Sequence, residues 1–304
     1  MKKISIFLLI LALLFGTGCQ KETTEKNSKV LTTAATQTNQ AKSPYVTKII
    51  RLNGARNSLV LVSFNGGNFG KSKSAEELEF IAEMFREADL IAIQEVSTSD
   101  FGAQAVARLA DDLNRKGNKW DYVISNSTHK SKGRERFGFL WKTRRINALP
   151  RSANLINSLE DSLEREPAKM FFKVNDKSFS LMSFHLVPTK KNPLNEVIAL
   201  GHNPDVFPAN NAIIVGDFNL GHEKLNSVFE NQLNFRHQIE GKTSLKSKLK
   251  DGNYYMREYD NIFVRGNITI CQVGILDFVP SFSDLSVARK ISDHLPVFIE
   301  FILN

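Results

Sequence analysis

The sequence predicts a single α+β domain at residues 45–304, and three observations support this prediction. Short apolar runs recur along this part of the chain, with the length of a buried strand rather than of a typical helix. Between some of them lie stretches whose apolar residues have helical spacing. No internal repeat or change of composition divides these residues, which are numerous enough to form one large core.

The N-terminus predicts an export signal in residues 1–18. Lys2 and Lys3 precede an apolar run at 4–15, and small residues follow, as in secretory signal peptides. A membrane-spanning helix would need about 20 apolar residues, so an uncleaved span is the weaker alternative.

We expect the signal to be cut before Cys19. The segment Gly16-Thr17-Gly18-Cys19 resembles a bacterial lipobox, in which the cysteine carries a lipid. Gly16 departs from that pattern, which prefers a leucine-like residue, and the alternative is an ordinary signal with an incidental cysteine. A lipid on Cys19 would make the protein a cell-envelope lipoprotein, held at a membrane; without it the protein would be secreted.

Residues 19–44 are predicted to form a flexible spacer, because a polar stretch without hydrophobic period cannot offset its ordering entropy. The formal net charge is +8, and loss of Lys2 and Lys3 with the signal leaves +6. A basic surface favours a polyanionic substrate, although anionic lipid or solubility would favour it as well. The only other cysteine, Cys271, is expected to be unpaired and packed as a small apolar residue.

Polar residues follow the predicted strands in the first half of the domain. The strand at 58–63 leads to Asn65 beside a glycine pair, and the strand at 90–93 leads to Glu95. A carboxylate at the end of a buried strand is costly unless it is paired or bound to a cation. The other elements expected here are a helix capped by Ser74, a helix at 104–114 and a strand at 120–125.

The same pattern continues in the second half. A basic stretch at 127–136 contains Glu135, and the strand at 179–184 ends at His185. Asp260 and the pair Asp293-His294 lie beside further strands. The other elements expected here are strands at 137–141, 259–264, 268–273 and 297–302, and a basic loop at 242–250.

The segment Val215-Gly216-Asp217-Phe218-Asn219 closes the apolar run at 212–215. In an extended backbone, residues two apart point to the same side, so Asp217 and Asn219 would address one ligand. Such oxygen donors suit Mg²⁺, Ca²⁺ or Mn²⁺ and a phosphate. The alternative is an ordinary turn after a strand. Because polar residues recur at strand ends along the chain, the sequence favours a cation and phosphate site over an ordinary turn.

Together these segments resemble the endonuclease/exonuclease/phosphatase superfamily and, within it, the deoxyribonuclease I family. The matching segments are SFNGGNFG at 63–70, IQEV at 93–96, RERFGFLW at 134–141, REPA at 165–168, SFHLVP at 183–188, VGDFN at 215–219, YDNIFV at 259–264 and SDHLPV at 292–297. The resemblance implies a four-layer α/β/β/α sandwich, in which two mostly antiparallel sheets pack face to face and helices flank them.

The resemblance also implies a metal and phosphate site. Glu95 would be the principal metal ligand, supported by Asn65 and Asp293. Asp217 and Asn219 would hold the phosphate or a second cation. Mg²⁺ is the expected cofactor, with Mn²⁺ and Ca²⁺ as alternatives.

Two acid/base pairs are implied in the same way. His185 would act with Glu135, and His294 with Asp260. A carboxylate beside an imidazole fixes its tautomer and raises its basicity. The basic side chains expected at the substrate phosphates are Arg134, Arg136 and Arg165.

The chain departs from the family at the residues that enter the DNA minor groove. Gly133 stands at the position of a family tyrosine, and Ser97 at that of a family arginine. Minor-groove insertion is therefore in doubt, although Lys130, Lys132 and Arg134 could still hold the backbone. The family's structural disulfides are also missing.

These features predict an exported, monomeric, divalent-metal-dependent endonuclease that cleaves DNA, with RNA as a further substrate, and with low sequence specificity. One alternative is a phosphodiesterase or phosphatase acting on lipid headgroups, of the sphingomyelinase or inositol-phosphate type. A repair nuclease for abasic sites is disfavoured by export. A non-catalytic nucleic-acid-binding surface protein is disfavoured because every proposed catalytic position is filled.

Overall fold

The computed structural model describes residues 43–51, 57–130, 133–149, 153–208 and 210–304. The expected signal peptide, Cys19 and nearly all of the expected spacer lie outside these residues, as does Lys132. Within the described part of the chain, no helix combines the length and the apolar character needed to cross a membrane.

The described residues build two large sheets in which most neighbouring strands are antiparallel. The first has the order β1 (Tyr45–Val46), β15 (Ile268–Leu276), β16 (Val297–Leu303), β2 (Leu59–Phe69), β3 (Leu90–Val96), β5 (Arg136–Lys142) and β4 (Trp120–Ile124). The second has the order β11 (Arg236–His237), β14 (Asp260–Arg265), β10 (Ala212–Asp217), β9 (Lys177–His185), β8 (Ala168–Val174) and β6 (Asn147–Ala148), with β7 (Asn154–Leu155) also paired to β8. Only the pairs β1–β15, β2–β3 and β9–β10 are parallel among these strands.

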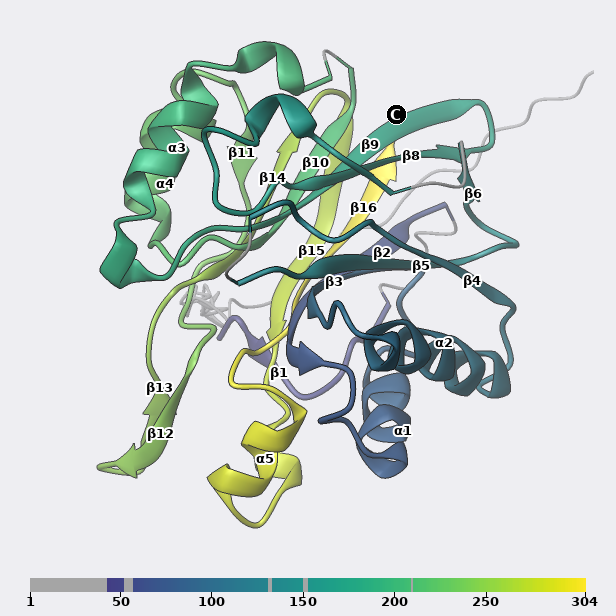
Figure 1. The fold of residues 1–304 in the computed structure, drawn as a ribbon. Helices are drawn as coiled ribbons and strands as arrows, with labels where there is room; N and C mark the ends of the chain where they lie inside the picture. Colours follow the sequence, from purple (N-terminus) through teal and green to yellow (C-terminus); the bar gives the residue numbers. More distant parts are fainter. Residues whose placement is uncertain (1–42, 52–56, 131–132, 150–152, 209) are drawn as a thin grey trace, which may run out of the picture. The chain divides into compact units, whose positions relative to one another are not determined.

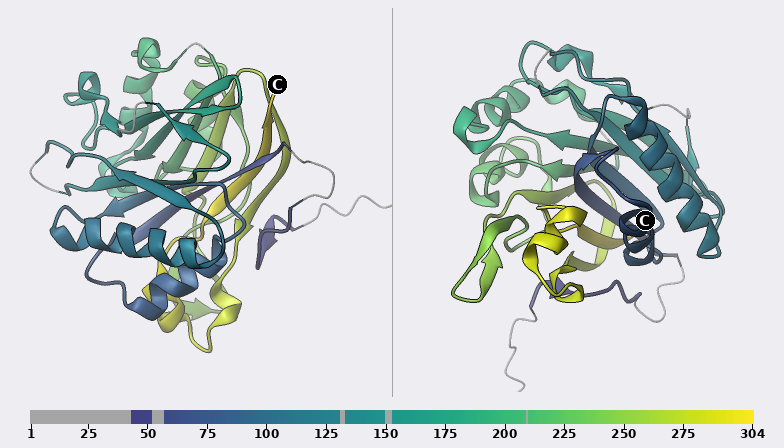
Figure 2. Two further views of the ribbon diagram at one scale, coloured as in Figure 1. Left: turned by 90° about the vertical axis from the view of Figure 1, so that its right-hand side faces the viewer. Right: turned by 60° about the horizontal axis from the view of Figure 1, so that its bottom comes forward.

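Helices cover the outer faces of the sheets (Figure 1; Figure 2). Helices α1 (Ala75–Met84) and α2 (Asp100–Arg115) lie outside the first sheet, and α3 (Leu194–Gly201) and α4 (His222–Phe229) lie outside the second. Helix α5 (Leu285–Ile291) precedes the last strand. The predicted four-layer sandwich is therefore confirmed.

The apolar runs are continuous because the strands of the second sheet are buried on both faces. Ile213 and Val215 of β10 belong to the core shared with the first sheet, whereas Ile214 belongs to the core under α3 and α4. Successive side chains of a strand point to opposite faces, so an unbroken apolar run fills both layers.

Several element boundaries differ from those expected. Strand β2 continues through Asn65 to Phe69, with a shift of register against β3, so this segment is a bulged strand and not a loop. Helix α2 begins at Asp100, ahead of the expected start. Ser74 caps α1 as predicted, in a capping box with Glu77.

Two further expectations were wrong. The basic segment at 242–250 is not a loop throughout, because β12 (Leu245–Lys250) pairs with β13 (Asn253–Tyr255) in an antiparallel hairpin. Cys271 is free but only half-buried, since it lies in β15 where the register shifts against β16.

The register of three strands in the second sheet aligns polar residues at one edge. Asp217, the last residue of β10, is paired with His185 of β9 on one side and with Asp260 of β14 on the other. Gly216 permits this close pairing: it has a φ of 143°, and a Cβ there would lie 1.9 Å from the carbonyl oxygen of Phe184.

Replacement of Gly216 should therefore destabilise the folded protein strongly. We expect Gly216→Ala to lower the free energy of unfolding by about 2–3 kcal/mol or more, from steric overlap in addition to backbone strain. Gly117→Ala is the matched control, because Gly117 also has a positive φ but a Cβ there meets no atom within 4 Å. Urea denaturation of both variants measures the difference, and equal losses would mean that the contact with Phe184 is unimportant.

Candidate active site

The first imidazole of the site is that of His185, at the end of β9. Its Nδ1 lies 2.7 Å from Oε2 of Glu135, which precedes β5 in the other sheet. Its Nε2 lies 3.5 Å from Oδ2 of Asp217 and 3.9 Å from Oε1 of Glu95. Glu135 therefore orients the ring so that Nε2 faces the other carboxylates.

The second imidazole has the same arrangement. Nδ1 of His294 lies 2.7 Å from Oδ2 of Asp260, and Nε2 lies 3.6 Å from Oδ2 of Asp217. The backbone N–H of His294 donates to Oγ of Ser292, 3.0 Å away. Both predicted histidine–carboxylate pairs are thus brought together, and their free nitrogens converge on one oxygen of Asp217.

The carboxylates raise the pKa of both histidines. Burial alone lowers the pKa of His185, but the charge and hydrogen bond of Glu135, together with Asp217, outweigh it. Burial is likewise outweighed at His294, where Asp260 and Asp217 hold the pKa well above its ordinary value. Each ring is therefore stabilised in its protonated form.

Asn65 connects the two sheets at the site. Its Nδ2 donates to Oε1 of Glu95 at 3.1 Å and to Oδ2 of Asp217 at 3.0 Å, while its Oδ1 accepts the N–H of Gly67. In this arrangement the amide orients two carboxylates and does not offer its oxygen to a cation. The ligand role of Asn65 stays a prediction.

Glu95 is held in a strained conformation at the mouth of the site. Its φ is 60°, uncommon for a residue other than glycine, and the register of β3 shifts here against β5. The N–H of Asn68 donates to Oε2 at 2.8 Å. A bulge of this kind re-aims a side chain, and here the Glu95 carboxylate remains partly exposed.

Asn219 does not have the conformation expected from the sequence. Strand β10 ends at Asp217, and Asn219 has a left-handed φ of 50°, so the extended-backbone argument was wrong. Its N–H donates to Oδ1 of Asp217 at 2.8 Å, and its Nδ2 donates to the carbonyl of Leu186 at 3.0 Å. Asn219 thereby fixes the turn that presents Asp217.

Asp293, next to His294, is the most exposed acid of the predicted set. Half of its side chain is accessible, and its Oδ2 lies 3.4 Å from the guanidinium of Arg289. Its position beside the second pair leaves its oxygens available to a cation.

The three predicted arginines have different positions. Arg165 is buried, and its guanidinium donates to the carbonyls of His185 at 2.8 Å and Leu186 at 2.6 Å, so it holds the backbone of the first histidine. Arg134 is exposed at a cleft beside Glu95. Arg136 begins β5 and is half-buried.

This cleft has a volume of about 420 Å³ and borders the first pair. Ser97 and Gly133, where the family was expected to carry larger side chains, both line it, together with Arg165. Their small size leaves the space beside Glu95 open.

The donor set fits a hard divalent cation. Glu95 and Asp293 present carboxylate oxygens that solvent reaches, and Mg²⁺ prefers such ligands together with water and phosphate. Elsewhere, His129, Glu160 and Glu166 place one ligand atom each within 4.8 Å of one another. Two of these three residues are exposed, and such groups are common on surfaces without an ion.

Two hydroxyl residues of the site were not found from the sequence. Oγ1 of Thr243 accepts the N–H groups of Tyr259 and Asp260, and Oγ of Ser292 donates to the carbonyl of Asn65. All three bonds join segments that are distant in the sequence, so no local signal marks Thr243 or Ser292.

Known proteins share sequence and fold with this chain. The model of the endonuclease/exonuclease/phosphatase family matches residues 62–294. The chain belongs to this family.

Deoxyribonuclease gamma from Rattus norvegicus is 27% identical over 290 residues, covering 84% of this chain and 89% of the relative. A deoxyribonuclease from Thioalkalivibrio sp. (strain K90mix) is 28% identical over 273 residues, covering 80% of this chain and 71% of the relative. Within the family, the chain therefore lies in the deoxyribonuclease I-like branch.

Solved structures share the fold. TDP2 from D. rerio, crystallised with a single-strand DNA product, aligns with a TM-score of 0.59 at 14% identity, covering 80% of this chain and 98% of that one. An endonuclease/exonuclease/phosphatase family protein from Bacteroides thetaiotaomicron aligns with a TM-score of 0.55 at 18% identity, covering 81% of this chain and 98% of that one. At these identities the likeness concerns the fold alone.

The role of Glu135 can be tested by titration. Glu135→Gln removes the largest charge that opposes the effect of burial on His185, so we expect the pKa of His185 to fall. NMR titration of the imidazole in metal-free protein measures it. Glu164→Gln is the control, because Glu164 pairs with Lys191 instead. An unchanged His185 pKa in Glu135→Gln would contradict the pairing.

Proposed function

We propose that the protein is a divalent-metal-dependent endonuclease that hydrolyses phosphodiester bonds of DNA, and of RNA as a further substrate. One observation carries the proposal: two histidine–carboxylate pairs converge on Asp217 beside the strained Glu95. This arrangement can hold a phosphate between two proton-transfer groups and next to a cation.

The residues divide the chemistry between them. Mg²⁺ held by Glu95 and Asp293 would neutralise the charge that develops on the phosphate. Of His185 and His294, one would serve as the base for the attacking water and the other as the acid for the leaving oxygen. Glu135 and Asp260 keep each ring in the tautomer that leaves Nε2 facing the reaction.

DNA is favoured as the substrate by the relatives. Deoxyribonuclease gamma and the bacterial deoxyribonuclease each align over most of this chain. Exposed Arg134 lines the cleft. Arg134 and the exposed Lys130 would contact the nucleic-acid backbone, which carries no sequence information, so specificity should be low. We further propose that the protein is an exported monomer, anchored by a lipid on Cys19.

Plasmid cleavage tests the activity. We expect Mg²⁺ to support nicking of supercoiled plasmid and EDTA to stop it. His185→Ala should reduce the rate by about 100-fold or more, because a proton-transfer group is lost. His202→Ala is the matched control, since His202 is exposed at the end of α3. Release of phosphocholine or inorganic phosphate from lipid headgroups, without cleavage of DNA, would instead support the headgroup hydrolase.

Metal binding can be tested separately from turnover. Glu95→Gln should weaken the binding of Mg²⁺ by about 10-fold or more, because a charged oxygen ligand is lost. Isothermal titration calorimetry measures this. Glu164→Gln, which removes a carboxylate that pairs with Lys191, should leave the affinity unchanged. Equal affinities for wild type and Glu95→Gln would exclude Glu95 as the principal ligand.

A further inference from the structure

Residues 242–257, which we call the basic hairpin, form a charged arm beside the site. Strands β12 and β13 are joined by Asp251 and Gly252, which both have positive φ. The arm extends beyond the two sheets (Figure 1; Figure 2, right panel). Its cations are Lys242, Lys246, Lys248, Lys250 and Arg257, and its only acid is Asp251.

These cations are not neutralised within the described part of the chain. None of the five belongs to an ion pair there, and Nζ of Lys246 donates to the backbone carbonyl of Asn253. Lys248 and Lys250 are exposed. Like charges close together repel, so an accumulation of this kind is stabilised by a polyanion.

The root of the basic hairpin is bonded to the catalytic segments. The N–H of Leu245 donates to the carbonyl of Asp293 at 2.8 Å, and Thr243 accepts the N–H of Asp260 through its hydroxyl. Arg289 of α5 donates to the carbonyl of Leu245 and contacts the carboxylate of Asp293. The position of the arm relative to the second histidine pair is therefore fixed by direct bonds.

Aromatic contacts hold the other strand of the arm. The hydroxyls of Tyr254 and Tyr255 both donate to Oδ2 of Asp277, at 2.6 and 2.5 Å. Tyr45 stacks on Tyr255 with ring centroids 4.3 Å apart. An arm that is held at both strands presents its charges in one place and loses little entropy when it binds.

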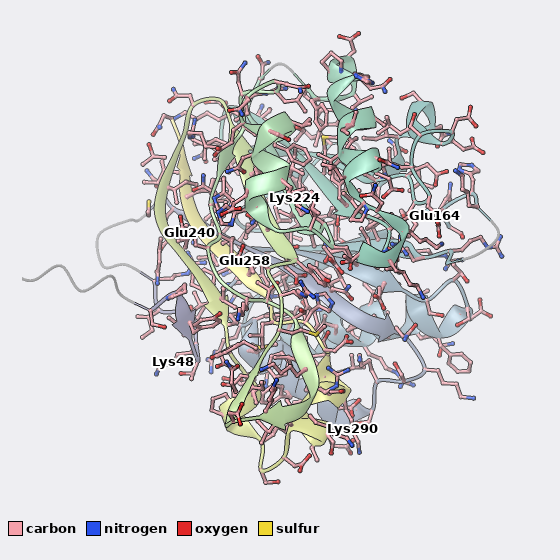
Figure 3. The ribbon with its side chains drawn as sticks, turned by 90° about the vertical axis from the view of Figure 1, so that its left-hand side faces the viewer. Lys48, Glu164, Lys224, Glu240, Glu258 and Lys290 are labelled. Atoms are coloured by element: carbon pink, nitrogen blue, oxygen red, sulfur yellow. The ribbon has the colours of Figure 1, made fainter. Side chains whose placement is uncertain are left out.

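A groove leads from the site to the arm. It has a volume of about 740 Å³, with Asn219 and Tyr259 at the site end and Lys242 and Arg257 at the hairpin end. Lys224 also lines it, as do Glu223 and Glu258. Glu258 is paired with His222 at 2.8 Å. Figure 3 shows Lys224 and Glu258 on the same face as the hairpin.

We propose that the basic hairpin binds the sugar–phosphate backbone of the substrate nucleic acid, beyond the phosphate that is cleaved. This proposal rests on the proposed nuclease function and extends its substrate surface to the side of the second histidine pair. The groove gives the nucleic-acid strand a path from the site to Lys242 and Arg257 at the root of the hairpin, and Lys248 and Lys250 lie further along the same arm.

The alternative occupant, an anionic membrane, could meet the exposed Leu249 and Met256 of the arm, but it is less favoured by the arm's aromatic residues. Its turn, Asp251-Gly252, has no aromatic side chain. Tyr254 and Tyr255 are half-buried, with their hydroxyls bonded to Asp277. Exposed aromatic anchors, which sit at membrane interfaces, are therefore missing from this arm.

The test compares a double variant with a control of equal charge. Lys248→Ala/Lys250→Ala should raise KM for plasmid DNA about 10-fold at moderate salt. It should leave kcat, and hydrolysis of the small diester bis(p-nitrophenyl) phosphate, unchanged. Lys48→Ala/Lys119→Ala removes two exposed lysines that do not line the groove. This control should leave KM, kcat and hydrolysis of the small diester unchanged.

Salt dependence gives a second readout that does not require cleavage. Binding of a labelled duplex by His185→Ala protein, followed by fluorescence anisotropy, should lose about 1.8 from its logarithmic salt slope when both hairpin lysines are removed. An unchanged slope, or the same change in the Lys48/Lys119 control, would overturn the proposal. So would loss of binding to anionic vesicles with DNA binding intact.

The two proposals fail in different ways. If wild-type protein binds DNA through the hairpin but cleaves no DNA, the nuclease function fails and the binding surface stands. If it cleaves DNA with equal KM in the double variant and wild type, the hairpin proposal fails and the nuclease function stands.

Discussion

The carboxylate of Asp217 is almost fully buried, and the groups around it are what make that burial possible. Its Oδ2 meets the amide of Asn65 and both Nε2 atoms, while its Oδ1 accepts the N–H of Asn219. A buried carboxylate is strongly destabilising unless hydrogen bonds or opposite charge compensate it. The contacts with Asp217 also contribute, after Glu135 and Asp260, to the raised pKa values of the two histidines. The site is therefore one electrostatic unit, and no member can be exchanged without a cost to the others.

The two sheets contribute to this unit by different means. In the second sheet, regular pairing alone places His185 and Asp260 on either side of Asp217. In the first sheet, Asn65 is still in register with Gln94, and the register shifts that follow in β2 and β3 place Glu95. The left-handed backbone of Glu95 costs on the order of 1–3 kcal/mol, which the regular sheet beneath it can support. Backbone strain is thus found at Glu95, whose partly exposed carboxylate has to face the buried carboxylate of Asp217.

The sequence was sufficient for features that depend on local pattern. Apolar runs predicted the main strands, and the polar residues at their ends predicted both histidine pairs, because a family resemblance fixed which strand ends meet. The sequence was not sufficient where contacts with the backbone of distant segments determine what a side chain does. The left-handed turn at Asn219 and the carbonyl contacts of Arg165 depend on distant segments. The hairpin at Leu245–Lys250 was missed because alternating lysines are poor strand formers, and pairing with β13 overrides that preference.

The cavities on either side of Asp217 bear on which substrates the site suits. The cleft with Ser97 and Gly133 borders the first pair through His185, and the groove toward the basic hairpin borders the second, since Tyr259 stacks on His294 at 6.3 Å. A small phosphate ester would reach the reacting groups without using both cavities. A polymer that crosses Asp217 would occupy the two together and meet cations on each side. Binding energy taken from parts of the substrate that do not react can be used to position the phosphate that does. This two-sided arrangement favours a nucleic-acid chain over a lipid headgroup as the substrate.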